Sequence, residues 1–435
     1  MPVQTRPLTE TAPPVARDSA ESASPIDFLI ETGSADSVAL SETTVAGFPG
    51  GVLAGDFDLP ITHNSRVQHY IELMTVRHRT SSETWLTRQG RYDAMIEERL
   101  REAGLPLTLK YLPLVESGYL TGVSSRASAV GLWQFMSGTA RLEGLEVSER
   151  VDDRVDPVLS TEGAVKHLAR LHNRYNNWSL ALAAYNSGMG RVDRALEAAG
   201  VTAAEGDSAF WAIHDQLPAE TRDYFPFFVA ASVVSRYPAL FEFGHVVPDA
   251  PRTWDEVSIP DETELAVVAR LLNVPAESIA VLNPRFVQGV TPRGRKTSLR
   301  VPEGAAERFL VAYADLPAEK RVTVRYHVVR RGETLSGIAL RYGVSAANLQ
   351  QANRIRRPEG LQVGTRLRIH GTGSAAVAVS ARNAPREVVH RVRSGESIWT
   401  IARRYGVPTG DLLAWNGLRK GSLIHPGDRL RVRTR

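Results

Sequence analysis

The sequence predicts a multidomain protein in which a mostly α-helical domain is followed by small α+β modules of β-α-α-β order. Three observations lead to this fold class. A chain of 435 residues is too long for one ordinary core. Apolar residues recur at helical spacing between about residues 59 and 245. Beyond residue 320, two stretches repeat each other at an offset of 63 residues.

Residues 1–58 are rich in Ala, Ser, Thr, Pro and acidic side chains, which predicts a disordered acidic lead or linker. They lack the apolar segment of a signal peptide, and no run approaches the roughly 18 apolar residues of a membrane span. The chain has no cysteine, which excludes disulfides, thiolate metal sites and a lipidated cysteine. We therefore expect export or membrane association to depend on a segment that is absent from this sequence.

Residues 59–245 are predicted to form the helical domain. Apolar side chains share one helix face at Val67, Tyr70, Ile71 and Met74, and segments 92–100 and 164–175 have the same spacing. Gly104, with Pro106 behind it, marks the end of one helix and the start of another. Alternating strand patterns are scarce in this region.

The two repeats span residues 324–370 and 388–433, joined by a Gly-, Ser- and Ala-rich linker over residues 371–387. Each copy has a short alternating strand, a Gly-Glu turn, an amphipathic helix, a second helix that ends at an Asn, and a closing strand. A degenerate third copy over residues 250–305 keeps the helix-turn-helix-Asn layout, with Asn283 in the corresponding place, although its first strand is not recognisable.

Charge is distributed unevenly along the chain. Residues 321–435 hold 22 Lys/Arg and 6 Asp/Glu, a net charge of +16, so residues 1–320 carry −12 of the total of +4. A basic region beside an acidic body favours an anionic partner, of which nucleic acid, a membrane surface and wall polymers are examples, although a solvated surface explains the charge equally well. Nucleic acid is not expected, because no binding motif or interleaved aromatic platform is present.

Glu116 is the candidate acid. It ends the apolar stretch that contains Leu112, Leu114 and Val115. A carboxylic acid between apolar walls is expected to have a raised pKa and can then act as a general acid on a glycosidic oxygen. A solvated Glu at a helix end is the alternative for this residue taken alone.

Two further segments have the composition of a sugar site. Gln134 lies beside Trp133 in ASAVGLWQFM, and Tyr185 and Asn186 precede a Ser-Gly pair in LALAAYNSGMGRV. Aromatic faces stack on sugar rings, and amide side chains bind hydroxyl and acetamido groups. Alternatively, Trp133 belongs to the core and the Asn-Ser-Gly run only caps a helix.

The segments LPLVESGY, GLWQFM, AAYNSG and ETRDYFPFF, in this order, resemble the four motifs of lysozyme-like lytic transglycosylases. The likeness is greatest to the membrane-bound D class, in which such a domain precedes LysM repeats, and the two clear repeats resemble LysM modules. The resemblance implies a lysozyme-like catalytic domain that acts on peptidoglycan, without a metal or cofactor. The missing lipobox cysteine and the unusual N-terminal region depart from the class and concern anchoring.

The resemblance also implies residue roles. Glu116 would be the sole acid/base, with Ser117 orienting the site and the Tyr224 hydroxyl close to Glu116. Gln134, Tyr185 and Asn186 would line the sugar subsites. In the LysM modules the sugar would lie between the loop after the first strand and the loop after the second helix, which gives ten candidate residues: Gly332, Glu333, Thr334, Leu335, Asn353, Gly395, Glu396, Ser397, Ile398 and Asn416. Turn building is an equally good interpretation of many of these.

The implied reaction is cleavage of the bond between N-acetylmuramic acid (MurNAc) and N-acetylglucosamine (GlcNAc), with closure of a 1,6-anhydro ring. Ordinary glycosidases use two carboxylates, and Asp152, Asp153 and Asp156 are the nearest candidates for a second, although their polar stretch favours turns and caps. A goose-type lysozyme-like hydrolase and an inactive peptidoglycan-binding protein remain alternatives. The expected partner is the peptidoglycan glycan strand, and the expected location is the periplasm or cell envelope.

Overall fold

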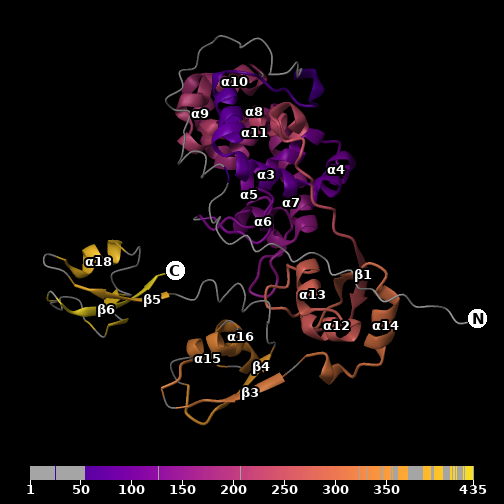
Figure 1. The fold of residues 1–435 in the computed structure, drawn as a ribbon, viewed down its shortest axis with the longest axis vertical. Coiled ribbons are helices and arrows are strands. Elements are labelled where there is room, and N and C mark those ends of the chain that lie inside the picture. The colour runs from indigo at the N-terminus through magenta and orange to yellow at the C-terminus, as the bar shows by residue number, and fades with distance from the viewer. Residues whose placement is uncertain are drawn as a thin grey trace, which may run out of the picture. The chain divides into compact units, whose positions relative to one another are not determined.

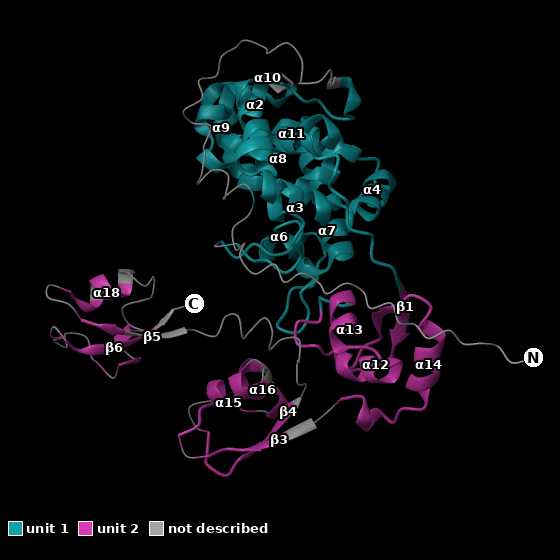
Figure 2. Ribbon diagram, viewed as in Figure 1, with its two compact units in different colours: residues 1–254, 283–285 teal, residues 255–282, 286–435 magenta. Residues whose placement is uncertain are grey.

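The computed structural model divides into two compact units, residues 1–254 with 283–285, and residues 255–282 with 286–435 (Figure 2). Each unit is described by itself. The structure describes these residues: 25, 54–125, 127–205, 207–322, 324–330, 332–342, 344, 346–353, 355, 361–370, 386–392, 396–404, 412–413, 415–416, 418, 425 and 427–434. Most of the predicted lead and the linker residues 371–385 lie outside them.

The first unit is built almost entirely of helices, as the spacing of its apolar residues predicts (Figure 1). The first elements of this unit are η3 (Ala54–Asp56), α2 (Ser65–Glu72), η4 (Leu73–Arg77), α3 (Arg79–Gln89), α4 (Asp93–Glu102), η5 (Leu107–Tyr111), α5 (Leu112–Ser117) and α6 (Ser137–Leu142). The remaining ones are η6 (Asp153–Val155), α7 (Pro157–Tyr175), α8 (Trp178–Ser187), α9 (Met189–Ala199), η7 (Ala203–Glu205), α10 (Asp207–Ile213), η8 (His214–Gln216), α11 (Ala219–Arg236) and η9 (Pro238–Phe241).

Helices α8 and α11 form the centre of this unit because they are apolar on nearly every face. Every residue of α8 from Trp178 to Ala184 is buried, and α11 packs against α2, α5 and α8. A helix without a polar face is stable only when other elements surround it. The buried ion pair of Arg66 on α2 with Asp223 on α11, at 3.2 Å, joins two of these helices.

Local signals set the helix ends as the sequence predicts. Gly104 adopts a φ of 66° just after α4, and η5 begins at Leu107. Asp156 caps α7 by accepting hydrogen bonds from the backbone N–H groups of Val158 and Leu159, both at 3.1 Å, with Pro157 in the first turn. Capping and a proline at the first position both favour helix initiation.

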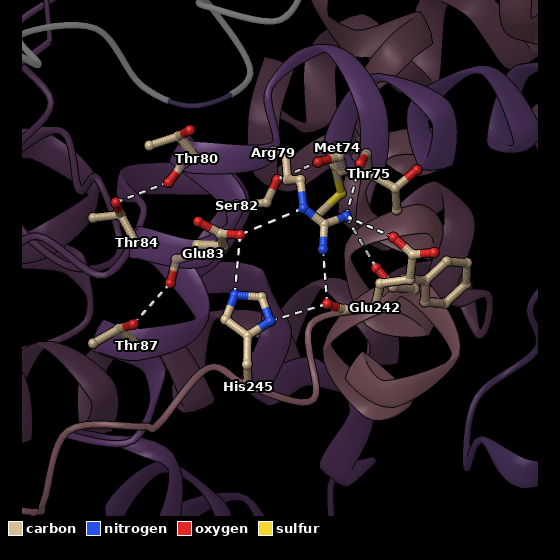
Figure 3. A network of polar contacts seen from close by, with 11 residues as sticks. Met74, Thr75, Arg79, Thr80, Ser82, Glu83, Thr84, Thr87, Glu242 and His245 are labelled. Carbon is tan, nitrogen blue, oxygen red and sulfur yellow. Dashed lines mark hydrogen bonds and ion pairs between the residues drawn. The ribbon is translucent and has the colours of Figure 1, made fainter.

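A polar network around Arg79 holds the end of η9 against α3 (Figure 3). The Arg79 guanidinium donates to the backbone oxygens of Phe241, at 3.3 Å, and Glu242, at 2.7 Å. Glu83, one turn further along α3, lies 3.5 Å from Arg79 and 3.3 Å from His245. The contacts stabilise the point at which the chain leaves the helical unit.

The second unit begins with a module whose first strand was not predicted from the sequence. Strands β1 (Trp254–Ile259) and β2 (Thr297–Pro302) pair, and α12 (Leu265–Leu272) and α13 (Ala276–Leu282) lie between them in the chain. Helix α14 (Ala306–Ala314) and η10 (Ala318–Lys320) follow β2. Phe309 of α14 is fully buried and α14 contacts α12, so this module continues past residue 305.

The two repeats each form an antiparallel two-stranded ribbon. In the first, β3 (Val324–Val328) pairs with β4 (Arg366–His370), with Val324 opposite His370, and α15 (Leu335–Tyr342) and α16 (Ala346–Asn353) lie between them. In the second, β5 (Arg386–Arg391) pairs with β6 (Arg429–Thr434), and α18 (Ile398–Arg404) follows β5. Each module has a small core of its own. The predicted fold class, a mostly α domain with β-α-α-β modules, is confirmed.

Within the described ranges, no helix has both the length and the apolarity required to cross a lipid bilayer.

Candidate active site

Glu116 lies at the end of the short helix α5, every residue of which is buried. Gly118 ends the helix with a φ of 57°, and its N–H donates to the Leu114 oxygen at 3.0 Å. A Cβ at Gly118 would lie 2.7 Å from the Trp85 ring, so the helix must stop at a glycine. The Glu116 side chain is thereby held in the wall of a cleft with 9% of its surface exposed.

Tyr224 donates a short hydrogen bond from its hydroxyl to Glu116 Oε1. It projects from α11 and is fully buried. Burial raises the pKa of Tyr224 well above its ordinary value of 10.0, and the nearby Glu116 charge raises it further. The phenol therefore stays protonated and acts as a fixed donor to the carboxyl group.

Gln134 lies at the tip of a tight hairpin closed by the two hydrogen bonds, each 3.1 Å long, that join the backbones of Val130 and Phe135. Its φ is 44°, an uncommon left-handed conformation for a residue with a side chain, and its Nε2 donates to the Gly131 oxygen at 2.8 Å. Gly131 has a φ of 87°, and a Cβ there would lie 1.9 Å from the Arg154 oxygen. The strain at Gln134 is thus imposed by a closely packed hairpin.

Ser117 and Tyr185 both hold the backbone of this hairpin. Ser117 Oγ donates to the Leu132 oxygen, and the Tyr185 hydroxyl donates to the Trp133 oxygen, each at 2.9 Å. The Trp133 side chain is fully buried and donates to Thr161 Oγ1 at 2.8 Å, so it belongs to the core and offers no face to a sugar. Burial raises the pKa of Tyr185 well above 10.0, with the Glu116 charge as a second cause.

Asn186 is fixed from the start of α11. Its Nδ2 donates to Glu220 Oε1, and its Oδ1 accepts from Thr221 Oγ1, both at 2.7 Å. These two bonds fix the positions of the amide oxygen and nitrogen. They leave one N–H of Nδ2 for an acceptor on a ligand.

The cleft has a volume of about 610 Å³. Four of the predicted site residues line it, namely Glu116, Gln134, Tyr185 and Asn186, whereas Ser117 and Tyr224 act from behind its wall. The other lining residues are Ser125, Ala127, Ala129, Phe135, Met136, Thr139, Leu142, Glu143, His167, Arg170, Leu171, Ala184, Ser187, Gly188, Met189, Arg191 and Glu220.

A cluster of charged and titratable side chains in this lining, centred on the buried Glu143, was not predicted from the sequence. Glu143 accepts from His167 Nδ1 at 2.8 Å and from Arg170 at 3.0 Å. Burial is the largest influence on His167 and lowers its pKa, although Glu143 opposes the shift. Nothing in the local sequence marks these residues, because they come from α7 and from the end of α6 and meet only in the fold. Glu220 was missed too, although it opens the quoted ETRDYFPFF segment.

The three candidate second carboxylates do not line the cleft. Asp152 accepts from Arg154 Nε at 2.9 Å, and Asp156 caps α7. Asp153 accepts from the Glu146 N–H at 2.8 Å and pairs with Arg285, and burial raises its pKa. The predicted turn and cap roles are confirmed for Asp152, which caps η6, and for Asp156, whereas Asp153 joins segments that are not adjacent in the chain.

In the LysM-like repeats the polar candidates bond within their own module. Glu333 accepts from His327 Nε2 at 2.6 Å, from the Arg330 N–H at 2.8 Å and from Arg341 at 2.6 Å, and Glu396 is 2.7 Å from His390 Nε2. Asn353 joins α16 to β4. Its Nδ2 donates to the backbone oxygens of Leu349 and Arg368, and its Oδ1 accepts from the Arg368 N–H. Asn416 makes the same bonds to Leu412 and Arg431.

The remaining candidates in the repeats lie in turns and in the module cores. Gly332 has a φ of 82°, and Thr334 Oγ1 accepts from the Gly337 N–H at 3.1 Å. Leu335 is buried, Ile398 packs against the core of the second repeat, and Ser397 bonds to Thr400. Gly395 lies outside the described residues. Glycan contacts by these ten residues stay a prediction.

Comparison with family models assigns the domains. Residues 93–206 match the transglycosylase SLT domain, and residues 327–370 and 390–433 match the LysM domain. Residues 253–318 match the LysM-like domain of the lytic transglycosylase MltD. A helical unit with a buried glutamate in its cleft, followed by β-α-α-β modules, thus defines a lysozyme-like lytic transglycosylase with LysM modules.

Comparison over most of the chain identifies the family within this class of lytic transglycosylases. The membrane-bound lytic murein transglycosylase D of Escherichia coli is 32% identical over 353 residues, which cover 78% of this chain and 75% of that protein. The chain therefore belongs to the family of membrane-bound lytic murein transglycosylase D. The putative tributyltin chloride resistance protein of an Alteromonas species is 34% identical over 116 residues, 26% of this chain and 56% of that one. The solved structure of an inactive mutant of the lytic transglycosylase Slt from Pseudomonas aeruginosa has 23% identity, covers 36% of this chain and 25% of that one, and gives a TM-score of 0.28.

Proposed function

We propose that this lytic transglycosylase cleaves the MurNAc-GlcNAc β-1,4 bond of peptidoglycan and leaves a 1,6-anhydroMurNAc end, with Glu116 as the acid/base. The observation that carries the proposal is the buried Glu116 in the wall of the cleft, oriented by the Tyr224 hydroxyl. The described lining holds two other carboxylates. Glu143 is paired with Arg170 and His167, and Glu220 is exposed and bonded to Asn186.

The reaction proceeds in two halves. Glu116 gives its proton to the glycosidic oxygen, the bond from the MurNAc C1 breaks, and the N-acetyl carbonyl oxygen of the same sugar stabilises the cationic C1. The Glu116 carboxylate then removes the proton from the 6-hydroxyl, whose oxygen attacks C1 and closes the anhydro ring. Glu116 is protonated again at the end, and no water is consumed.

The other site residues supply position. Asn186, with its amide fixed by Glu220 and Thr221, presents an N–H that suits a carbonyl oxygen such as that of an acetamido group. Gln134 offers a second amide from the strained hairpin tip, and Ser117 and Tyr185 keep that hairpin in place. A site held by packed hairpin and helix positions loses less entropy when the sugar chain binds.

The LysM modules hold the enzyme on its polymer by binding GlcNAc-containing strands, and the net charge of +16 over residues 321–435 adds a salt-dependent attraction to the anionic wall. Because peptidoglycan lies outside the cytoplasmic membrane, the proposed location is the periplasm or the cell envelope.

The proposal is tested by Glu116→Gln. Gln has nearly the shape of protonated Glu, so folding and binding to sacculi are expected to persist, whereas proton transfer in both halves is lost. Loss of general acid–base catalysis costs about 10²–10⁴-fold, and more when one group serves both steps. The measurement is release of muropeptides from sacculi, with Asp152→Asn and Asp156→Asn as controls that keep most activity. Full activity of the Gln variant rejects the site.

Mass spectrometry of the released muropeptides separates the remaining alternatives. The transglycosylase product is lighter by one water than the product of hydrolysis. A hydrated product would indicate a goose-type lysozyme-like hydrolase. If the folded wild-type protein binds sacculi but releases nothing, the chain is a binding protein.

A further inference from the structure

Arg191 differs from the other charged residues that line the cleft. Each of the three carboxylates there has a partner, and Arg170 is paired with Glu143. Among the described residues, Arg191 has no carboxylate within ion-pair distance, and its guanidinium donates only to the backbone oxygen of Ser187, at 2.9 Å. The remaining guanidinium donors of this exposed side chain are available to a ligand.

The position of Arg191 is fixed by the fold. Gly188, with a φ of 87°, turns the chain from α8 into α9, and Arg191 lies in the first turn of α9. The hydrogen bond to Ser187 anchors the guanidinium to the end of α8, next to Asn186. The first turn of α9 has no side-chain cap, so the positive end of the helix dipole adds to the cation. This part of the cleft rim therefore attracts an anion.

Met189 adds an apolar surface two residues before Arg191, with 37% of its surface exposed in the same lining. The sugar rings of a peptidoglycan strand are uncharged, and carboxylates occur on the peptide stems that hang from MurNAc through a lactyl group. The first part of a stem is apolar, with the lactyl and alanyl methyl groups, and acidic residues follow. An apolar side chain beside a cation that lacks a carboxylate partner in the described ranges matches this order of groups.

We propose that Arg191 binds a stem-peptide carboxylate of the strand that lies in the cleft, and that the enzyme prefers strands whose stems carry free carboxylates. This inference rests on the proposed function, because it requires the glycan to occupy the cleft beside Glu116. It assigns Arg191 a role in substrate selection and none in proton transfer.

The test uses the full chain and two forms of soluble, uncrosslinked glycan-peptide strands. One form is native, and in the other the stem carboxylates have been converted to amides, which keeps the size and removes the charge. The quantity measured is the ratio of kcat/KM for native over amidated strands, at low and at high salt. The variants are Arg191→Gln, Arg191→Lys and, as a matched control, Arg194→Gln. Arg194 is an exposed arginine on the same helix that does not line the cleft.

We expect Arg191→Gln to lower this ratio about three- to tenfold, mainly by raising KM for native strands. An exposed charge-assisted hydrogen bond strengthens binding by about this factor. Arg191→Lys should keep part of the preference, Arg194→Gln should keep all of it, and salt should weaken the preference of the wild type. A wild type that turns over both forms equally overturns the inference, as does an equal loss on both forms in Arg191→Gln. Failure of the proposed function is distinct, because the wild type would then release no anhydro product from either form.

Discussion

At the scale of single residues, the proposed chemistry depends on the pair of Glu116 and Tyr224. A glutamate that must first donate and then accept a proton needs a fixed orientation, and the Tyr224 hydroxyl supplies it by donating to one carboxyl oxygen. Because burial keeps the pKa of Tyr224 well above 10.0, this donor stays protonated at neutral pH. We therefore infer that Tyr224 is a positioning residue whose effect would reach the substrate through Glu116.

Tyr224→Phe removes this hydrogen bond and keeps the ring that fills the core. We expect kcat to fall about tenfold to a hundredfold with little change in KM, because a hydrogen bond to a charged group contributes about 1.5–3 kcal/mol. The measurement is steady-state release of anhydromuropeptides, together with the pH profile of kcat, whose limb assigned to Glu116 should move. A drop in kcat with an unchanged pH profile would contradict an effect that acts through the carboxyl group.

Gln134 shows how a single backbone conformation depends on distant contacts. A φ of 44° is unfavourable for glutamine, and the hairpin keeps it because Gly131 packs on the Arg154 backbone while Ser117 and Tyr185 hold the adjacent carbonyls. A strained conformation of this kind costs of order 1–3 kcal/mol and persists only when its surroundings impose it.

At the scale of elements, α11 supplies three side chains that orient two residues of the cleft. Glu220 and Thr221, in its first turn, orient the Asn186 amide, and Tyr224, one turn further on, orients Glu116. Residues three and four apart share a helix face, so a single rigid element aligns both contacts. Every residue of α11 from Phe225 to Val234 is buried, and all but Ser232 are apolar, which fixes the helix in the core.

The LysM modules have a polar element of their own in the Gly-Glu turn. Three donors hold Glu333 and lower its pKa to about 2, the Arg330 N–H first and His327 second. The folded pKa lies below the ordinary value of 4.5. The unfolded module therefore binds more protons between these two values, so this contribution to stability is present above about pH 4.5 and is lost as the pH falls toward 2.

We expect the first LysM module to lose stability as the pH falls from 7 to 3, and Glu333→Gln to make the module less sensitive to this change. The variant is less stable than the wild type at pH 7, and the difference narrows at pH 3. Thermal melting of residues 321–435, followed by NMR signals of the first module, provides the measurement. A difference between variant and wild type that is the same at both pH values would show that Glu333 acts only through its neutral contacts.

At the scale of the whole molecule, catalysis and binding to the cell wall belong to different domains. The helical unit contains the entire cleft, and each LysM module has its own ribbon, helices and core. Weak sites on one chain gain affinity through effective concentration, since a module bound to the wall keeps the cleft near further strands. The basic charge of residues 321–435 acts in the same direction at low salt.

Truncation after residue 320 should leave a folded enzyme that binds whole sacculi poorly. This position retains Arg285, which belongs to the first unit and lies 2.9 Å from Asp153. Binding is measured by sedimentation with sacculi, and activity on short soluble strands serves as the control for folding. The region 321–435 alone should sediment with peptidoglycan, and less so at high salt. Sacculus binding that is unchanged by the truncation would remove the modules from this role.

The sequence predicted the modular order, the helical character of the first unit, the β-α-α-β repeats and Glu116 as the candidate acid. Most of these features follow from short-range patterns, because helix spacing, caps and turn glycines act within a few residues. The assignment of Glu116 also depends on motifs whose order resembles one family. The turn and cap roles of Asp152 and Asp156 were likewise readable from their local context.

The contacts that hold the site residues in place could not be predicted from the sequence. Tyr185 bonds to the backbone of a residue 52 positions away, and Glu143 meets His167 and Arg170 across 24 and 27 positions. Three further features depend on which elements pack together: the burial of Trp133, the internal bonds of Glu333 and Asn353, and the bond of Arg191 to Ser187, with no carboxylate partner for Arg191 in the part of the chain that the structure describes. Such contacts leave no local signal, because their free energy arises from desolvation and geometry that exist only once distant helices have packed.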